Sequence, residues 1–120
     1  MQLKTKASPV DLMFRAFSDR TRLRILNMLR GGEVCVCDLV AVIAAPQPKV
    51  SRHLAYLRRA GLVFGRKDGL WTHYRLAPAQ GVFHRKLLEC LANCLADVPQ
   101  LAEDLTLLKR VRQQKAACCA

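Results

Sequence analysis

The sequence predicts a mainly helical domain with a single β-hairpin, and three features carry this prediction. Apolar residues recur at helical spacing over most of the chain. One Asp-Gly pair stands between two short runs typical of strands. The 120 residues, 52% of them hydrophobic, suit one domain with a real core. We expect a single domain over residues 1–120, with a core over 9–98 and a C-terminal helix and cysteine-bearing tail over 99–120.

Four helices are expected before the hairpin. They cover residues 9–17, 19–30, 33–45 and 48–60. Ser18 or Asp19 offers an N-cap oxygen to the second helix, and two glycines end it. Pro46 ends the third helix, while Pro48 suits the first turn of the fourth. The order of elements is therefore helical up to about Gly61.

The hairpin and a long C-terminal helix follow. Strands are expected at residues 62–66 and 70–76, with the turn at residues 67–69. From about residue 80, seven residues alternate steps of four and three in a heptad-like seam. They are Leu87, Leu91, Cys94, Val98, Leu101, Leu105 and Leu108. Pro99 must kink this helix or begin a new one, and we expect the tail over 110–120 to be mobile.

The charge of the chain favours a polyanionic partner. Twenty Lys and Arg face nine Asp and Glu, for a formal net charge of +11. Such a field attracts nucleic acid or an anionic membrane surface. The first residues do not resemble a signal peptide and no apolar run is long enough to span a membrane, so we expect a cytoplasmic protein without a membrane partner. No carboxylate pair, catalytic triad or phosphate-binding glycine loop appears, so an enzyme is not expected.

Residues 33–60 provide a helix, a tight turn and a second helix with a polar face, and the hairpin follows directly. This arrangement predicts a winged helix-turn-helix, in which one helix enters the major groove of double-stranded operator DNA. The expected DNA-binding residues are Gln47, Lys49, Ser51, Arg52, His53, Tyr56 and Arg58 on the helix, and Arg66 and Lys67, with Arg75, on the wing. Their division between base and phosphate contacts is left open. Because operators are usually symmetric half-sites, we expect a homodimer, paired through the first and last helices.

Three runs of the sequence resemble one family. They are SDRTRLRIL over residues 18–26, VSRHLAYLRRAGLV over 50–63 and GLWTHYRL over 69–76. Together they look like the ArsR/SmtB family of metal-responsive repressors, across roughly residues 10–100. The resemblance implies a winged-helix homodimer that represses its own resistance operon and leaves DNA when it binds an inducer ion.

The run EVCVCDLV over residues 33–40 resembles the arsenic-responsive signature of that family. In the commonest version of the signature, a third cysteine stands where this chain has Val40. Thiolates select soft ions, and the resemblance implies trivalent arsenic held by three sulfurs. We expect As(III) or Sb(III) as inducer, bound by Cys35 and Cys37, with no constitutive cofactor. Cys118 or Cys119 is a possible third ligand; these two could instead form a separate site or an inert tail.

The spacing of Cys35 and Cys37 suggests a switch. Residues two apart on a regular helix point about 200° away from each other. We therefore expect that one ion can bind both only if the first turn of the third helix unwinds, which would misalign the recognition helix. Cys90 and Cys94 lie one helical turn apart and could bridge an ion, although packing in a dimer interface is the favoured interpretation.

Three other functions remain open at this point. The same fold could sense cadmium or lead, which would need four ligands for cadmium rather than three. The cysteines could instead oxidise in a redox-sensing DNA-binding regulator. A basic nucleoid-type structural protein is the third candidate, and it would show no operator preference. A zinc site on the C-terminal helix is disfavoured, because His84 lacks partners at ligand spacing.

Overall fold

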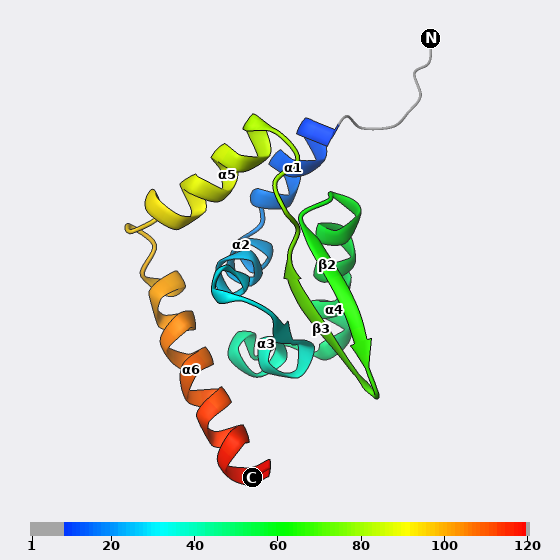
Figure 1. Cartoon of the computed structure of the whole chain (residues 1–120). Coiled ribbons are helices and arrows are strands. Elements are labelled where there is room, and N and C mark those ends of the chain that lie inside the picture. Colours follow the sequence, from blue (N-terminus) through cyan, green and yellow to red (C-terminus); the bar gives the residue numbers. More distant parts are fainter. Residues whose placement is uncertain (1–8, 120) are drawn as a thin grey trace.

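The computed structural model describes residues 9–119, with side chains from residue 10 to residue 115. Its elements are α1 (Pro9–Phe17), α2 (Arg20–Met28), the 3-10 turn η1 (Leu29–Gly31), β1 (Val34–Cys35), α3 (Val36–Ile43), α4 (Gln47–Arg59), β2 (Val63–Asp68), β3 (Trp71–Leu76), α5 (Val82–Asn93) and α6 (Pro99–Cys119) (Figure 1). The predicted fold class, mainly helical with a β-hairpin, is confirmed. The strand β1 was not predicted.

The first helices begin and end close to the predicted positions. The Asp19 carboxylate accepts the backbone N–H of Arg22 at 3.0 Å, which is the N-cap expected for α2. After η1, Gly32 takes a φ of +130°, where a side chain would be strained. Farther along, α3 ends at Ala44 in the left-handed region, just before Pro46.

The sheet has three antiparallel strands in the order β1-β3-β2. Val34 pairs with Tyr74 and Cys35 with His73, so β1 adds an edge to the hairpin. Asp68 pairs with Trp71, which leaves a two-residue loop of Gly69 and Leu70. The predicted turn over residues 67–69 therefore begins two residues too early and ends one residue too early. Gly69 has a φ of +64°, and hairpin loops of this length need a left-handed residue at their first position.

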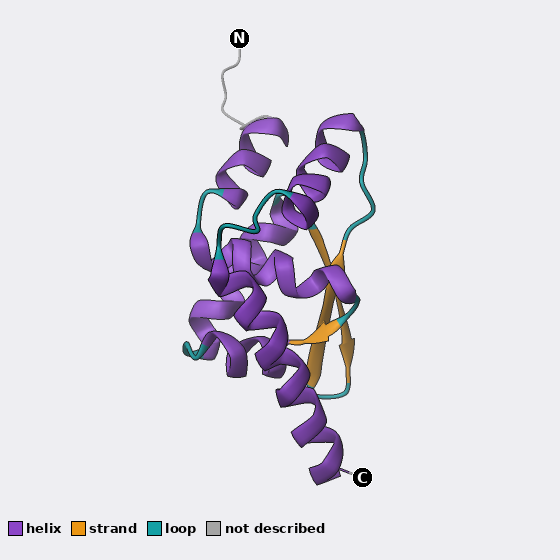
Figure 2. Ribbon diagram, turned by 90° about the vertical axis from the view of Figure 1, so that its left-hand side faces the viewer, coloured by secondary structure: helices purple, strands orange, loops and turns teal. Residues whose placement is uncertain are grey.

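The core lies where α2, α3 and α4 pack together against one face of the sheet. Its fully buried side chains include Ile25, Leu26, Leu39, Leu54, Leu57 and Leu62. The apolar stripe predicted on α4 is therefore confirmed as core, and its polar face is turned to solvent. Figure 2 shows the helices gathered on one side of the strands.

The C-terminal region departs from the predicted single seam. The helices α5 and α6 are separated by residues 94–98, and α6 turns back to pack along α2 and α3 (Figures 1 and 2). Pro99 begins the new helix, as one of the two sequence interpretations allowed. Cys94 is exposed at the end of α5, so it does not pack on a seam within the protomer. The tail that was expected to be mobile is helical as far as Cys119, where α6 ends.

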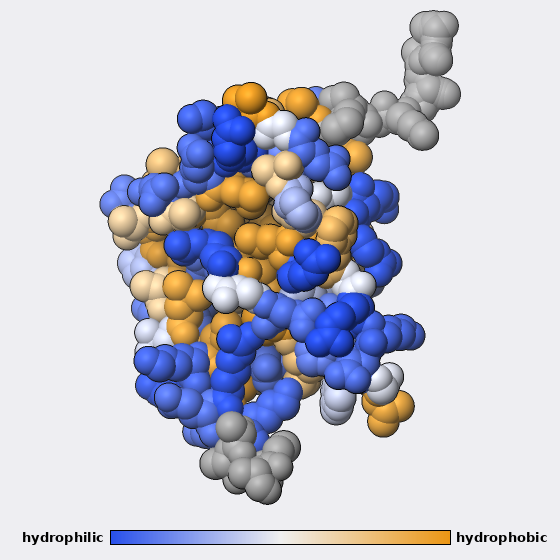
Figure 3. Space-filling model, viewed as in Figure 1, coloured by the Kyte–Doolittle hydropathy of each residue, from blue (hydrophilic) through white to orange (hydrophobic). Residues whose placement is uncertain are grey.

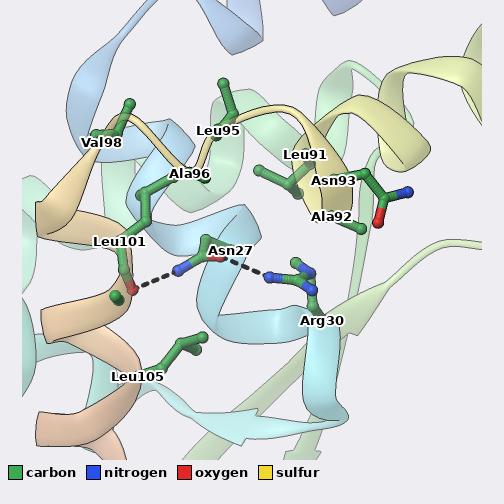
Figure 4. Close-up of a pocket in the computed structure, with 11 residues that line it drawn as sticks. Asn27, Arg30, Leu91, Ala92, Asn93, Leu95, Ala96, Val98, Leu101 and Leu105 are labelled. Carbon is green, nitrogen blue, oxygen red and sulfur yellow. Dashed lines mark hydrogen bonds between the residues drawn. The ribbon is translucent and has the colours of Figure 1, made fainter.

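Polar contacts fasten α6 to α2. The Arg24 guanidinium donates to both carboxylate oxygens of Asp104, at 2.8 and 2.9 Å, and Asp104 is only 1% exposed. Asn27 donates its side-chain amide to the Leu101 carbonyl at 2.9 Å and accepts from Arg30 at 3.1 Å. Asn27, Arg30 and Leu101 also line a small pocket between α2, α5 and α6 (Figure 4). Satisfied buried polar groups of this kind fix one orientation of the helix.

None of the helices within residues 9–119 combines the length and apolar character that a membrane crossing needs.

Candidate DNA interface and dithiol site

The outer face of α4 carries every DNA-binding candidate predicted on that helix. Four of them are exposed and three are half-buried, while Val50, Leu54 and Leu57 face the core. The exposed residues are Gln47, Lys49, Arg52 and Arg58, and the half-buried ones are Ser51, His53 and Tyr56. The structure therefore brings the predicted set together on one surface.

Two arginines missed by the sequence analysis complete this surface. Arg22 stacks 4.1 Å above the Tyr56 ring centroid and Arg59 lies 5.0 Å from it. With Lys49, Arg52 and His53, they line a shallow groove. Arg59 could have been found from its place one turn after Tyr56 on the same helix. Arg22 comes from α2 and only the tertiary fold brings it there. Arg22 already donates to the backbone carbonyls of Ala16 at 3.1 Å and Arg15 at 2.9 Å, so its main contacts lie within the protomer. Arg59 is exposed, and a guanidinium beside an aromatic ring is a preoriented donor for phosphate.

His53 lies at the edge of this groove. Partial burial is the main cause that lowers its pKa, and the nearby Arg22, Lys49 and Arg52 add to the effect, while Asp19 opposes it. The imidazole is therefore neutral at physiological pH, so it can donate at one nitrogen and accept at the other.

The wing residues differ in how far contacts within the protomer occupy their side chains. Arg66 makes a two-pronged contact with the Glu33 carboxylate at 2.8 and 2.7 Å. This contact holds the pKa of Glu33 below its ordinary value. Lys67 is exposed, and Arg75 lies 4.9 Å from the Phe64 ring. Arg66 is thus engaged within the protomer, and its role as a DNA contact stays a prediction.

The two cysteines of the signature meet at a junction between strand and helix. Cys35 is the N-cap of α3 with an extended backbone, φ −70° and ψ 143°, while Cys37 lies in the first helical turn. Their sulfur atoms are 2.9 Å apart. The premise that both residues lie on a regular helix is wrong, because β1 holds Cys35 extended opposite His73. The dithiol therefore forms without any unwinding of α3.

The last turns of α6 cover this dithiol. Lys115 donates to the Cys37 sulfur at 3.1 Å and lies 3.6 Å from the buried Asp38 carboxylate. Arg112 donates to the Glu33 carbonyl at 2.6 Å. The contact with Cys37 raises the pKa of Lys115, and burial raises the pKa of Cys35. Lys115 and Arg112 were not among the predicted site residues, since a segment expected to be mobile has no predictable neighbours.

Comparisons with known proteins agree with this geometry. The family model described as "Bacterial regulatory protein, arsR family" matches residues 19–64. The chain is 45% identical over 87 residues to the arsenical resistance operon repressor of Escherichia coli, covering 72% of this chain and 74% of the relative. This chain belongs to the ArsR family.

Two further relatives extend the likeness of this ArsR-family chain. It is 34% identical over 116 residues to the arsenic resistance transcriptional regulator ArsR2 of Pseudomonas putida, covering 93% of this chain and 98% of the relative. A homodimeric winged helix-turn-helix domain from Mycobacterium bovis, Mb0332, superposes with a TM-score of 0.61 at 29% identity, covering 74% and 79% of the two chains. The winged helix-turn-helix prediction is confirmed, and the family consists of DNA-binding transcriptional regulators rather than enzymes.

The remaining cysteines of this regulator occupy different settings. Cys118 and Cys119 end α6, but their side chains lie outside the described residues. Among the side chains that the structure does describe, no three Cys, His, Asp or Glu residues gather as a metal site. Cys90 and Cys94 are both exposed, and their mutual hydrogen bond raises the pKa of Cys90. The identity of a third ligand therefore stays a prediction.

Proposed function

We propose that this ArsR-family protein is a cytoplasmic repressor that binds operator DNA as a homodimer and releases it when As(III) or Sb(III) binds Cys35 and Cys37. One observation carries the proposal. The two sulfurs lie 2.9 Å apart at the point where the wing meets the helix-turn-helix. The relatives named for arsenic resistance support the choice of inducer.

The dithiol has the chemistry that a trivalent metalloid requires. Sulfur is a soft ligand and favours arsenic or antimony over hard cations. Each sulfur forms a bond to arsenic and displaces one hydroxide from As(OH)₃. The first hydroxide leaves as water with a thiol proton, and the second leaves as water with a thiol or solvent proton. Cys35 and Cys37 together thus fill two of the three positions.

The register of α6 supports a third sulfur from its end. Lys115 on this helix already contacts Cys37, and residues 118 and 119 follow three and four positions later. Positions at this spacing share a helix face, one turn farther along the axis. On this sequence spacing, Cys118 or Cys119 is the proposed third ligand. A separate site or an inert tail remain the competing interpretations of these two residues.

The junction around the dithiol connects three parts of the protein. Cys35 pairs with His73 of β3, so it belongs to the sheet that forms the wing. Cys37 begins α3, the first helix of the helix-turn-helix. Glu33 binds Arg66 of the wing through its carboxylate and Arg112 of α6 through its carbonyl. A change at residues 33–38 therefore reaches both DNA-binding elements at once.

The junction suggests a switch that differs from unwinding. An arsenic atom bonded to both sulfurs replaces the contact between them and takes the place of the Lys115 donor on Cys37. The distance between β1 and α3 is then set by the two arsenic–sulfur bonds, and α6 loses the contact between Lys115 and Cys37. The inducer and the operator therefore favour two different arrangements of the same junction.

The apolar surface of α1 and α5 supports the homodimer. Val10, Phe14 and Val82 are large exposed apolar residues on these helices. Phe14 and Phe83 pack edge to face with centroids 5.0 Å apart, so the two helices form one surface. Figure 3 shows apolar atoms exposed at the upper end of the molecule, where α1 and α5 lie in Figure 1. A second copy would cover this surface, as the homodimeric state of Mb0332 suggests.

The test is release of DNA by arsenite. A labelled duplex from the region upstream of the coding sequence is bound by the protein, and its anisotropy is followed as arsenite is added. The wild type should release the duplex. Cys35→Ser and Cys37→Ser should bind the duplex with nearly unchanged affinity and release none of it. Cys94→Ser is the matched control and should release as wild type. Normal release by either signature variant contradicts the proposal.

A thiol-redox regulator is the second candidate, because two sulfurs at 2.9 Å are close enough to form a disulfide with little movement. Hydrogen peroxide would accept the two electrons and leave as water while the S–S bond forms. Peroxide should then release the duplex without arsenite, and mass spectrometry should show the loss of two hydrogens. Cadmium or lead sensing is separated by stoichiometry, since cadmium takes four sulfurs.

A further inference from the structure

The tip of the wing presents two large apolar side chains to solvent. Leu70 is 95% exposed, the most of any large apolar residue whose side chain is described, and the neighbouring Trp71 is 51% exposed. Both belong to the end of the β2–β3 hairpin, which projects from the lower right of Figure 1. Figure 3 shows apolar atoms protruding at the same place. Nothing in the described part of the protomer covers them.

The hairpin loop has no conformational need for an apolar residue. Gly69 supplies the left-handed position, and turn positions are usually filled by glycine or by small polar residues. Of the other large exposed apolar residues, Val10, Phe14 and Val82 lie on α1 and α5, where the second copy is expected, while Phe64 and Leu105 lie on β2 and α6. The apolar tip of the wing thus belongs to a different surface and needs a different partner.

The surroundings of the tip indicate the partner. Lys67 and Arg75 are exposed on the hairpin, and Arg66 makes a two-pronged contact with Glu33 and lies 3.9 Å from Asp68, so the three cations outnumber the two carboxylates. The tip therefore combines an apolar end with a basic flank. This combination suits DNA, whose minor groove takes apolar wedges between base steps while its phosphates bind the flanking cations.

The position of the tip agrees with that partner. The strand β2 follows α4 closely in the chain and packs against it. In Figure 1 the N-terminal end of α4 and the tip of the hairpin point toward the same end of the molecule. When the N-terminal turns of α4 enter the major groove, the tip is carried to the flanking minor groove. The wing surface is thus continuous with the DNA-binding face of α4.

We propose that Leu70 and Trp71 form an apolar wedge that the wing inserts into the minor groove of bound DNA. This contact gives a preference for base steps that unstack easily, such as TA, without any hydrogen bond to a base. The proposal rests on DNA binding by the family and is independent of the inducer. Failure of arsenite to release DNA would leave it untouched.

Trp71 is the only tryptophan of the chain, so its emission reports on the wing tip directly. The intact protein is titrated with the upstream duplex of about 30 base pairs, enough for two half-sites. Binding is followed separately by the anisotropy of a label on the DNA. At saturation the Trp71 emission should be strongly quenched, and its accessibility to acrylamide should fall severalfold. Emission and accessibility equal to those of the free protein would overturn the proposal.

A pair of variants separates an apolar contact from an electrostatic one. Leu70→Ser should weaken binding roughly tenfold, by loss of apolar burial, and leave the salt dependence of the affinity unchanged. Lys67→Gln is the matched control and should reduce the salt slope by about one. Leu70→Met should restore most of the affinity. Because Leu70 is exposed in a loop, thermal melting should be the same for all four proteins.

Two outcomes would assign the tip to something else. Wild-type affinity in Leu70→Ser shows that DNA does not contact the tip. A change of oligomeric state in that variant, measured by sedimentation with unchanged DNA affinity, makes the tip a protein contact. Either result rejects the wedge. Netropsin, which occupies the minor groove, gives an independent check, since it should cancel the difference between wild type and Leu70→Ser.

Discussion

The two cysteine pairs whose side chains the structure describes have similar local chemistry and very different surroundings. Cys90 and Cys94 are exposed one turn apart on a single helix, and they hydrogen-bond to each other. Cys35 and Cys37 join a strand to a helix and lie beneath a second helix from the end of the chain. A ligand on the first pair would change one surface of α5. A ligand on the second pair would, on the proposed function, change how the wing, the helix-turn-helix and α6 fit together. Coupling to function thus depends on what a dithiol connects.

The largest effect on this comparison is expected from a variant that weakens the packing of α6 on α2. Asp104→Ala leaves the partly buried Arg24 without its bidentate partner, and breaking such a pair costs about 3 kcal/mol of folding free energy. We expect this loss in urea unfolding of Asp104→Ala. Alkylation of Cys37 should become faster as α6 loosens, while Cys94 should keep its rate.

Glu103→Ala is the matched control for that experiment, since Glu103 is exposed on the same helix. It should keep the stability of the wild type and the alkylation rates of both cysteines. An equal acceleration at Cys37 and Cys94 in Asp104→Ala would instead indicate general unfolding and would contradict a cover by α6 that is specific to Cys35 and Cys37.

Lys115 provides a milder way to loosen the cover of the dithiol. Lys115→Met removes the N–H donor on the Cys37 sulfur and keeps the length of the side chain. One hydrogen bond involving a charged group is worth about 1 kcal/mol at a partly exposed position, so amide exchange in the last turns of α6 should rise about fivefold. Hydrogen–deuterium exchange with mass spectrometry measures this. Lys109→Met, exposed on the same helix, should leave exchange in those turns at the wild-type rate.

The smallest predicted effect is a change in the pKa of one thiol. Each of the two pairs contains one thiol with a raised pKa, but the causes differ. For Cys90 the main cause is the hydrogen bond to Cys94, whereas for Cys35 it is burial. A raised thiol pKa means less thiolate at a given pH. Cys94→Ala should therefore bring the pKa of Cys90 back toward its ordinary value and speed its alkylation at pH 8 by about twofold. An unchanged rate would show that the two exposed sulfurs do not interact in solution.

Much of the DNA-binding half could be predicted because its signals are local. The apolar stripe of α4, the cap at Asp19 and the loop glycine of the hairpin each act within a few residues of their own position. The order helix, helix, helix, helix, hairpin follows from them. The outward face of α4 follows as well, since a helix that buries one stripe must expose the other. Arg22 was missed because it reaches Tyr56 from another helix.

The sequence by itself thus determined the winged helix-turn-helix, its polar recognition face and the presence of a dithiol in the signature segment. Only the tertiary structure decided that Cys35 is extended, because its strand conformation comes from pairing with His73 far along the chain. It likewise decided that α6 folds back, so that Lys115 meets Cys37 from 78 residues away. Local periodicity records which face of an element is apolar. It holds no information about which distant element will cover that face, and in this protein the covered junction is where the sulfurs lie.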